Sequence, residues 1–236
     1  MFRHKGNTRT LQHNLRLASL LSFVAGIVNV AGFLSVQRMT TNVTGHFAFL
    51  VDEVLHLNFW TGFIFFMYIF SFFLGSFCSK FIVELVARKN DNLIYVIPTV
   101  IESILLFSAA ACGQFLVLNN ANLLVCSLLF IMGLQNSLVT TISNSVVRTT
   151  HLTGLFTDLG IELSQLFFYK LKEQKEQLHS SIKLRLTIIS FFFLGGLSAG
   201  LLYSKIKLHV LAIAGIILLI GIIYDELNQK SARQIK

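Results

Sequence analysis

Hydrogen-bonding side chains gather in two short segments of one pattern, residues 41–45 (T-N-V-T-G) and residues 150–154 (T-H-L-T-G). Hydroxyl, amide and imidazole groups bind small polar solutes through hydrogen bonds. A helix beginning at such a segment adds backbone N–H groups suited to an anion. These segments, with the polar residues that accompany them, are therefore our candidates for binding a solute: Asn29, Thr41, Asn42, Thr44, Gly45, His46, Gln135, Asn136, Arg148, Thr150, His151, Thr153 and Gly154.

The match between the two motifs extends along the chain in both directions. Upstream, a glycine precedes an asparagine by three positions in each copy, and downstream a glutamate follows at the same distance. The sequence F-F-L-G also occurs twice, at residues 72–75 and 192–195. Four matches in the same order predict an internal duplication. The paired residues outside the motifs are Gly26, Asn29 and Glu53 in the first copy and Gly133, Asn136 and Glu162 in the second.

Each of these features has a structural interpretation beside the functional one. Thr44 and Thr153 are suited to cap the helices that follow them, and capping alone would explain each Thr-Gly pair. Asn29 and Asn136 either line a solute path with Gln135 or bond each other across the interface between the repeats. Both interpretations remain open at this point.

Acidic residues supply candidates for binding a proton or an ion. Glu102 falls within an apolar stretch, and acidic side chains inside a membrane are functional candidates by default. Pairing with a buried cation is the alternative for Glu102. Glu53 and Glu162 are candidates because they match between the two copies, although they are expected near the membrane interface.

The elements that must position these residues are membrane helices. Of the 236 residues, 54% are hydrophobic and 13% are charged, whereas a soluble domain has about 25% charged residues. Continuous apolar runs predict helices that cross a bilayer. After each motif, residues 45–57 and 154–169 are too short and polar to cross and predict half-helices, and residues 170–185 predict a charged linker. We expect spans at residues 17–36, 59–81, 93–111, 121–139, 186–203 and 209–224.

This arrangement predicts two repeats of opposite orientation, because each has an odd number of spans. The expected division is a basic tail at 1–16, a repeat at 17–118, a second repeat at 119–224 and a tail at 225–236, with a short loop at 113–120 between the halves. With six crossings and cytoplasmic termini, sixteen of the nineteen Lys and Arg residues lie inside; with eight crossings, only twelve do. The positive-inside rule favours six crossings with both termini cytoplasmic.

Other classes of protein find little support in the sequence. The three cysteines have no metal-site spacing, and no H-E-x-x-H, G-x-S-x-G or Walker A motif occurs. We expect no catalytic residues, no enzymatic activity, no metal and no cofactor. The net charge of +8 is attributed to membrane orientation rather than to nucleic-acid binding. The expected partners are the lipid bilayer and an unidentified small solute, and a homo-oligomer is compatible with this interpretation.

The residues around both motifs also resemble a known family. Residues 26–33 (G-x-x-N-x-x-G-F) followed by 41–46, and residues 133–136 (G-L-Q-N) followed by 147–154, resemble two signatures of the YoaK family of bacterial membrane proteins, domain-of-unknown-function family 1275. The resemblance covers nearly the whole chain and implies a multi-pass protein of the bacterial inner membrane. Many members have Asp where Asn29 stands and Asn where His46 stands, and the family has no established activity.

Together these features predict a small-solute transporter or channel, with the two motifs facing each other across a polar cavity at the membrane midplane. The alternative is a membrane sensor or assembly protein that transports nothing.

Overall fold

The computed structural model describes residues 9–89 and 93–234, which are helical with no strands. Four helices are each long and apolar enough to cross a membrane, and a fifth such stretch runs from Lys172 to Asn228 through α7, η3 and α8. The expected all-helical membrane fold is confirmed at this level. The elements are α1 (Leu11–Val36), α2 (Thr44–Leu55), α3 (Phe59–Ala87), α4 (Val96–Asn119), α5 (Ala121–Ser143), α6 (Leu152–Phe168), α7 (Lys172–Ile206), η3 (Lys207–His209) and α8 (Val210–Gln234).

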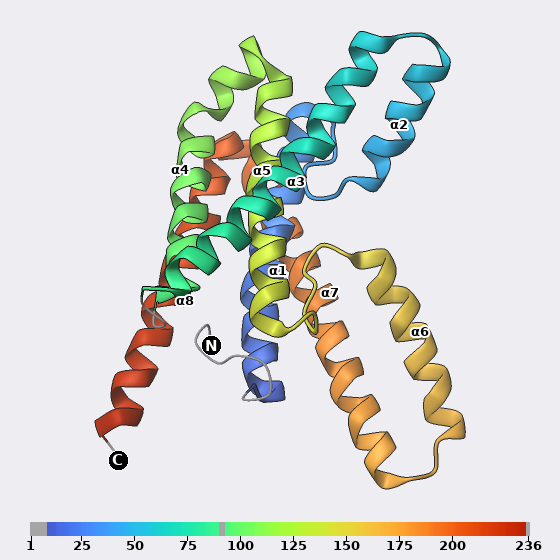
Figure 1. The fold of residues 1–236 in the computed structure, drawn as a ribbon, viewed down its shortest axis with the longest axis vertical. Coiled ribbons are helices and arrows are strands. Elements are labelled where there is room, and N and C mark those ends of the chain that lie inside the picture. The colour runs from blue at the N-terminus through green and yellow to red at the C-terminus, as the bar shows by residue number, and fades with distance from the viewer. Residues whose placement is uncertain (1–8, 90–92, 235–236) are drawn as a thin grey trace.

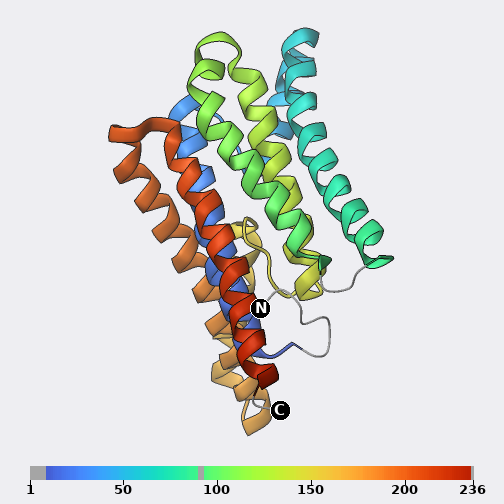
Figure 2. The ribbon, with the colours of Figure 1, turned by 90° about the vertical axis from the view of Figure 1, so that its left-hand side faces the viewer.

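The long helices associate between the two halves of the chain. Helix α1 packs along α7, α3 packs along α5, and α4 packs along α8. Followed from N- to C-terminal end in Figure 1, α1 and α7 run upward, whereas α5 and α3 run downward. Figure 2 shows α4 and α8 side by side on one face of the bundle. Each half therefore completes its packing only against the other half.

Glycines let the backbones of crossing helices touch. A methyl group at Gly26 of α1 would overlap the carbonyl oxygen of Phe192 in α7, and one at Gly133 of α5 would overlap that of Phe72 in α3. Gly195 meets the carbonyl oxygen of Phe23, and Gly75 meets that of Phe130, in the same way. Small residues commonly permit such close contacts between membrane helices. The glycines that matched in the sequence are thus the points where α1 crosses α7 and α3 crosses α5.

The two short helices lie beside the long ones. Helix α2 packs along α3 and α6 packs along α7, and neither is among the stretches able to cross a membrane. In Figure 1 both begin in the middle part of the molecule and run toward opposite ends. Both occupy the segments where half-helices were expected, within two residues at each end.

Two expected irregular segments are helical instead. The predicted charged linker at 170–185 is mostly the first part of α7, because its Lys, Glu, Gln and Leu residues favour helix; the exposed Lys172 and Glu176 add only a weak i,i+4 contact at 4.0 Å. The predicted loop at 113–120 reduces to Asn120, whose side chain accepts a hydrogen bond from the Leu123 N–H at 3.1 Å and starts α5. The expected N-terminal tail is partly helical, since α1 begins at Leu11; residues 1–8, with Arg3 and Lys5, lie outside the described residues, as do residues 235–236.

Candidate functional site

The loop between α1 and α2 folds back against the helix it leaves. Helix α1 ends at Val36, and the cap residue Gln37 has a left-handed φ of 52°. Thr41 then donates a hydrogen bond to Asn29 Oδ1 at 2.8 Å, and Thr40 donates to the carbonyl oxygen of Val28 at 3.3 Å. Both threonines are buried. The first threonine of the motif therefore binds the asparagine that precedes it by twelve positions, and this bond holds the loop against α1.

The loop between α5 and α6 repeats this arrangement. Helix α5 ends at Ser143, and the cap residue Asn144 also has a left-handed φ, of 53°. Thr150 donates a hydrogen bond to Asn136 Oδ1 at 2.9 Å, and Thr149 approaches the same atom at 3.5 Å. Gln135 adds a link between the halves, because its Nε2 donates to the carbonyl oxygen of Leu21 in α1 at 2.8 Å.

These bonds overturn two sequence-based interpretations. Asn29 and Asn136 each bond to the loop that follows their own helix and not to each other. Neither Thr44 nor Thr153 caps its helix: the cap positions are Val43 and His151, without a side-chain hydrogen bond. The second threonine of each motif lies inside the first turn and is exposed, because the first threonine and the asparagine already fix the loop.

In the first half, the space beside α2 is filled by aromatic rings. Phe49 stacks on Phe65 with ring centroids 5.2 Å apart, and His46 lies 5.1 Å from Tyr68. The guanidinium group of Arg38 lies over the Phe65 ring at 5.4 Å. Burial lowers the pKa of His46, partly offset by the hydrogen bond from its Nε2 to the Met39 carbonyl oxygen at 2.7 Å. His46 is therefore a neutral packed ring near pH 7.

In the second half, the corresponding space is a polar cavity of about 480 Å³. It lies at the start of α6, between the α5–α6 loop and α7. Gly154 belongs to its lining, and a methyl group there would lie 2.9 Å from the His151 ring, so the glycine lets the imidazole rest on the start of α6. The polar side chains in the lining are those of Ser145, Arg148, His151, Asp158, Ser181 and Arg185.

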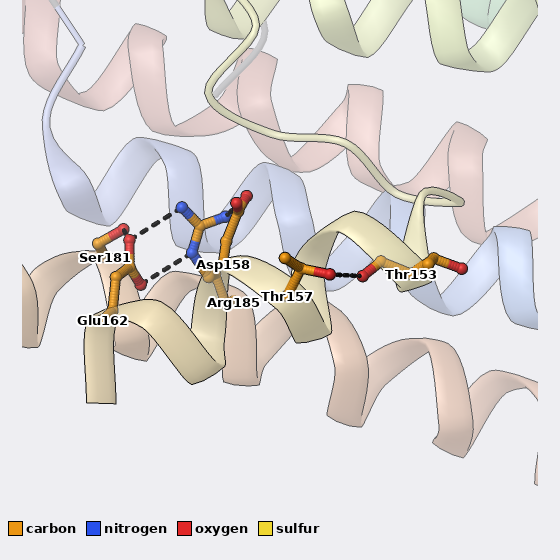
Figure 3. A network of polar contacts seen from close by, with 6 residues as sticks. All are labelled: Thr153, Thr157, Asp158, Glu162, Ser181 and Arg185. Carbon is orange, nitrogen blue, oxygen red and sulfur yellow. Dashed lines mark hydrogen bonds and ion pairs between the residues drawn. The ribbon is translucent and has the colours of Figure 1, made fainter. Parts of the chain in front are cut away.

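An ionic network forms one wall of this cavity (Figure 3). Arg185 of α7 donates from Nε and Nη2 to the two carboxylate oxygens of Glu162 at 2.8 and 2.9 Å, and from Nη1 to Asp158 at 2.8 Å. Ser181 donates to Glu162 at 2.6 Å. Bidentate contacts of this kind are among the stronger hydrogen bonds in proteins. They fasten α6 to α7.

The Glu162 carboxylate is stabilised by these donors. Burial acts to raise the pKa of Glu162, but the hydrogen bonds from Arg185 and Ser181 and the positive charge of Arg185 outweigh it, and the pKa lies below its ordinary value. Glu162 is therefore ionised at neutral pH and acts as a structural partner of Arg185. A carboxyl group that exchanges a proton near pH 7 needs a raised pKa, whereas the contact with Arg185 lowers the pKa of Glu162.

The remaining candidates are scattered. Thr44 is exposed, while Asn42, Gly45 and Glu53 are half-buried, and none of these four lines the cavity of the second half. Glu102 lies in α4, fully buried, with both carboxylate oxygens unpaired. The structure thus brings Arg148, His151 and Gly154 together in the cavity lining. Glu162 does not line the cavity but bonds to Arg185, which does.

Sequence reasoning missed Arg185 and Ser181 and gave Asp158 no role in the site. The missing step was the secondary structure of residues 170–185, which were expected to form a linker. Within a helix, Ser181 and Arg185 are one turn apart, as are Asp158 and Glu162 on α6. Two facing pairs with this spacing are the signal that would have indicated an ion-paired hairpin.

The comparisons with known proteins agree with a membrane protein. The chain is 27% identical over 188 residues to a UPF0700 transmembrane protein, YoaK, of Bacillus subtilis (strain 168), a match that covers 74% of this chain and 78% of that protein. No solved structure matches the chain. Residues 17–224 match the model of the family described as "Protein of unknown function (DUF1275)", and the chain therefore belongs to that family.

Proposed function

We propose that the chain consists of two inverted repeats that together cross the bacterial inner membrane six times, with both termini in the cytoplasm. The matched backbone contacts of Gly26 and Gly133, the matched bonds of Thr41 and Thr150, and the opposite directions of α1 and α5 support the inversion. Helices α1 and α5, α3 and α7, and α4 and α8 are then the equivalent spans, with α2 and α6 as half-helices. Repeats of this kind are common in secondary transporters.

The proposed function is the movement of a small polar solute that has a negatively charged group. The cavity at the start of α6 carries this proposal, because Arg148 lies in its lining without an ion-pair partner among the described residues. The N-terminal end of a helix attracts anions through its free N–H groups and its dipole. Asp158 does not cancel this attraction fully, since Arg185 already holds it.

The two halves differ in a way that favours one solute site rather than two. Four positions after the motif glycine, the first half has Phe49 and the second half has Asp158. Phe49 stacks on Phe65, so an aromatic ring stands where the second half has a carboxylate of the cavity lining. A polar cavity shared by Thr44, Gly45, Thr153 and Gly154 stays a prediction, and Gly154 is the member that lines the cavity described here.

Reconstituted protein provides the test. We would place the purified full-length chain in liposomes and record charge movement on rapid exchange to chloride, phosphate or acetate. Arg148→Gln should abolish or strongly reduce the signal, because it removes the unpaired cation at the cavity. Arg88→Gln removes an exposed cation at the end of α3, outside the cavity lining, and should leave the signal unchanged.

A result with no signal for any anion, or with equal losses in both variants, would contradict the proposed solute class. Uptake of a neutral or cationic solute that survives Arg148→Gln would keep transport but reject the role of Arg148.

One observation favours the alternative, a protein that assembles in the membrane without transport. The outer face of α3 has a row of exposed rings whose centroids lie between 5.9 and 6.3 Å apart along most of the helix. Such a stripe suits a second copy as well as lipid. Mass measurement in nanodiscs distinguishes a second copy from lipid. If the protein is a dimer and the double variant Phe66→Ala, Phe70→Ala is a monomer, the contact between copies lies on α3.

A further inference from the structure

We infer that Glu102 is a proton-binding site inside the helix bundle, which exchanges its proton with water when the bundle opens. It lies in α4, apart from the solute cavity, whose lining comes from α6, α7 and the loop between α5 and α6. The inference stands independently of the proposed transport, because such a site can exist in a protein that moves no solute.

The side chain is buried without any partner for its charge. Glu102 has no exposed surface, and neither carboxylate oxygen has a hydrogen-bond partner. Transferring an unpaired carboxylate from water into an apolar interior is so costly that such groups take up a proton instead. The neutral carboxylic acid is the form that these surroundings stabilise.

The helices packed on α4 provide no described counter-charge that would hold a carboxylate there. Helix α5 contains no charged residue. On α3, Lys80 and Glu84 pair with each other at 2.7 Å on the exposed surface. On α8 the charged residues whose side chains are described are Asp225 and Glu226, which are acidic. On η3, which meets α4 near Gly113, Lys207 and His209 are exposed, and the Lys207 ammonium lies over the Tyr203 ring at 5.5 Å.

Other unpaired polar atoms lie within about one helical turn of the level of Glu102. Helices α4 and α5 meet at the single residue Asn120. Glu102 lies eighteen positions before Asn120, so it is level with the part of α5 about eighteen positions after Asn120, near Leu138. Gln135, one turn away from that level, has an unpaired buried Oε1. Ser76 of α3 donates to the Gly133 carbonyl oxygen at 3.0 Å. Ser79, also in α3 and with an unpaired hydroxyl, therefore lies beside the part of α5 about one turn beyond Gly133.

Proton release from Glu102 needs water. The acid O–H bond breaks, the proton passes to a water molecule that enters when the helices separate, and a carboxylate remains that the entering water can solvate. Unpaired polar atoms in a membrane interior are costly to retain. A fully buried acidic side chain without a partner, in a bundle that holds other unpaired polar atoms, fits proton exchange better than packing.

Infrared spectroscopy of the full-length protein in liposomes tests this. Protonated carboxylic acids have a carbonyl stretch that carboxylates lack. Wild-type protein should show this band at neutral pD, shifted in D₂O, and raising the pD should remove it reversibly. Glu102→Gln, close in shape to the neutral acid, should fold and lose the band. Glu84→Gln, which removes an exposed carboxylate, should keep it.

Each other outcome overturns the inference. A band absent at neutral pD means that Glu102 is ionised. A band that neither shifts in D₂O nor responds to pD means a sealed acid that exchanges no proton. A band that Glu102→Gln leaves unchanged belongs to another residue. If Glu102→Gln does not fold, Glu102→Asp should retain the band at a displaced frequency, and an unmoved band would again assign it elsewhere.

Discussion

Thr41 donates a hydrogen bond to the side-chain oxygen of Asn29 over 2.8 Å, which closes the loop after α1 onto the helix it has just left. Thr41 follows Asn29 by twelve positions and is almost fully buried. In the second half, Thr150 and Asn136 make the equivalent bond at 2.9 Å. The start of each short helix is thus fixed by a polar contact made within its own half.

Removing one of these hydroxyl groups should destabilise the protein. Thr41→Val keeps the shape of the side chain but leaves Asn29 Oδ1 unpaired, which costs about 1–3 kcal/mol. Thr44→Val, in the same motif, removes an exposed hydroxyl and should change stability by less than about 0.5 kcal/mol. Unfolding in detergent micelles measures both. Equal effects from the two variants would show that the bond to Asn29 contributes nothing particular.

A methyl group at a helix crossing should be more disruptive. Gly133→Ala would place Cβ on the carbonyl oxygen of Phe72, and only movement of the α3 or α5 backbone could relieve the overlap. Overpacking of this kind costs about 1–3 kcal/mol or more. Gly160→Ala is the matched control, since nothing lies within 4 Å of a Cβ there and alanine favours helix. Membrane abundance and thermal unfolding should fall for the first variant only.

The sequence predicted the long helices well and the contacts between them poorly. Apolar runs had to form helices, because backbone groups need internal partners in lipid. The paired glycines also marked real crossing points, at Gly26 and Gly133. Their partners could not be predicted, since neither composition nor periodicity indicates that α1 lies along α7 rather than along a helix of its own half.

The candidate site was predicted only in part, for the same reason. Arg148, His151 and Gly154 stood out because they belong to a repeated motif, and they do line the cavity. Arg185 stood in a charged run that resembled a linker, and its role depends on two carboxylates more than twenty positions away. Such a long-range contact leaves no periodic signal in the sequence.

Topology provides a further prediction. The distribution of Lys and Arg predicts that Asn119 lies outside the cell and Glu173 in the cytoplasm, and Figure 1 places the α4–α5 connection and the start of α7 at opposite ends of the molecule. Single cysteines at these positions, in a variant without the three native cysteines, can be labelled in intact cells by a thiol reagent that does not cross membranes. The reagent should modify position 119 and spare position 173. Modification of position 173 alone would mean that the orientation is reversed.

The contact between Glu162 and Arg185 predicts how stability depends on pH. Because the folded-state pKa of Glu162 lies below its ordinary value of 4.5, the unfolded chain binds the proton first as the pH falls. This contribution to stability is therefore complete above the ordinary value and is lost as the pH falls through the folded-state pKa. Glu162→Gln should flatten this part of the pH profile and lower stability near pH 7 by about 1–3 kcal/mol, since it removes a charge-assisted contact. Glu173→Gln, at an exposed position, should retain the wild-type profile. Unfolding measured from pH 7 down to about pH 3 would decide, and a Glu162→Gln profile as steep as the wild-type one would mean that other carboxyl groups govern the acid response.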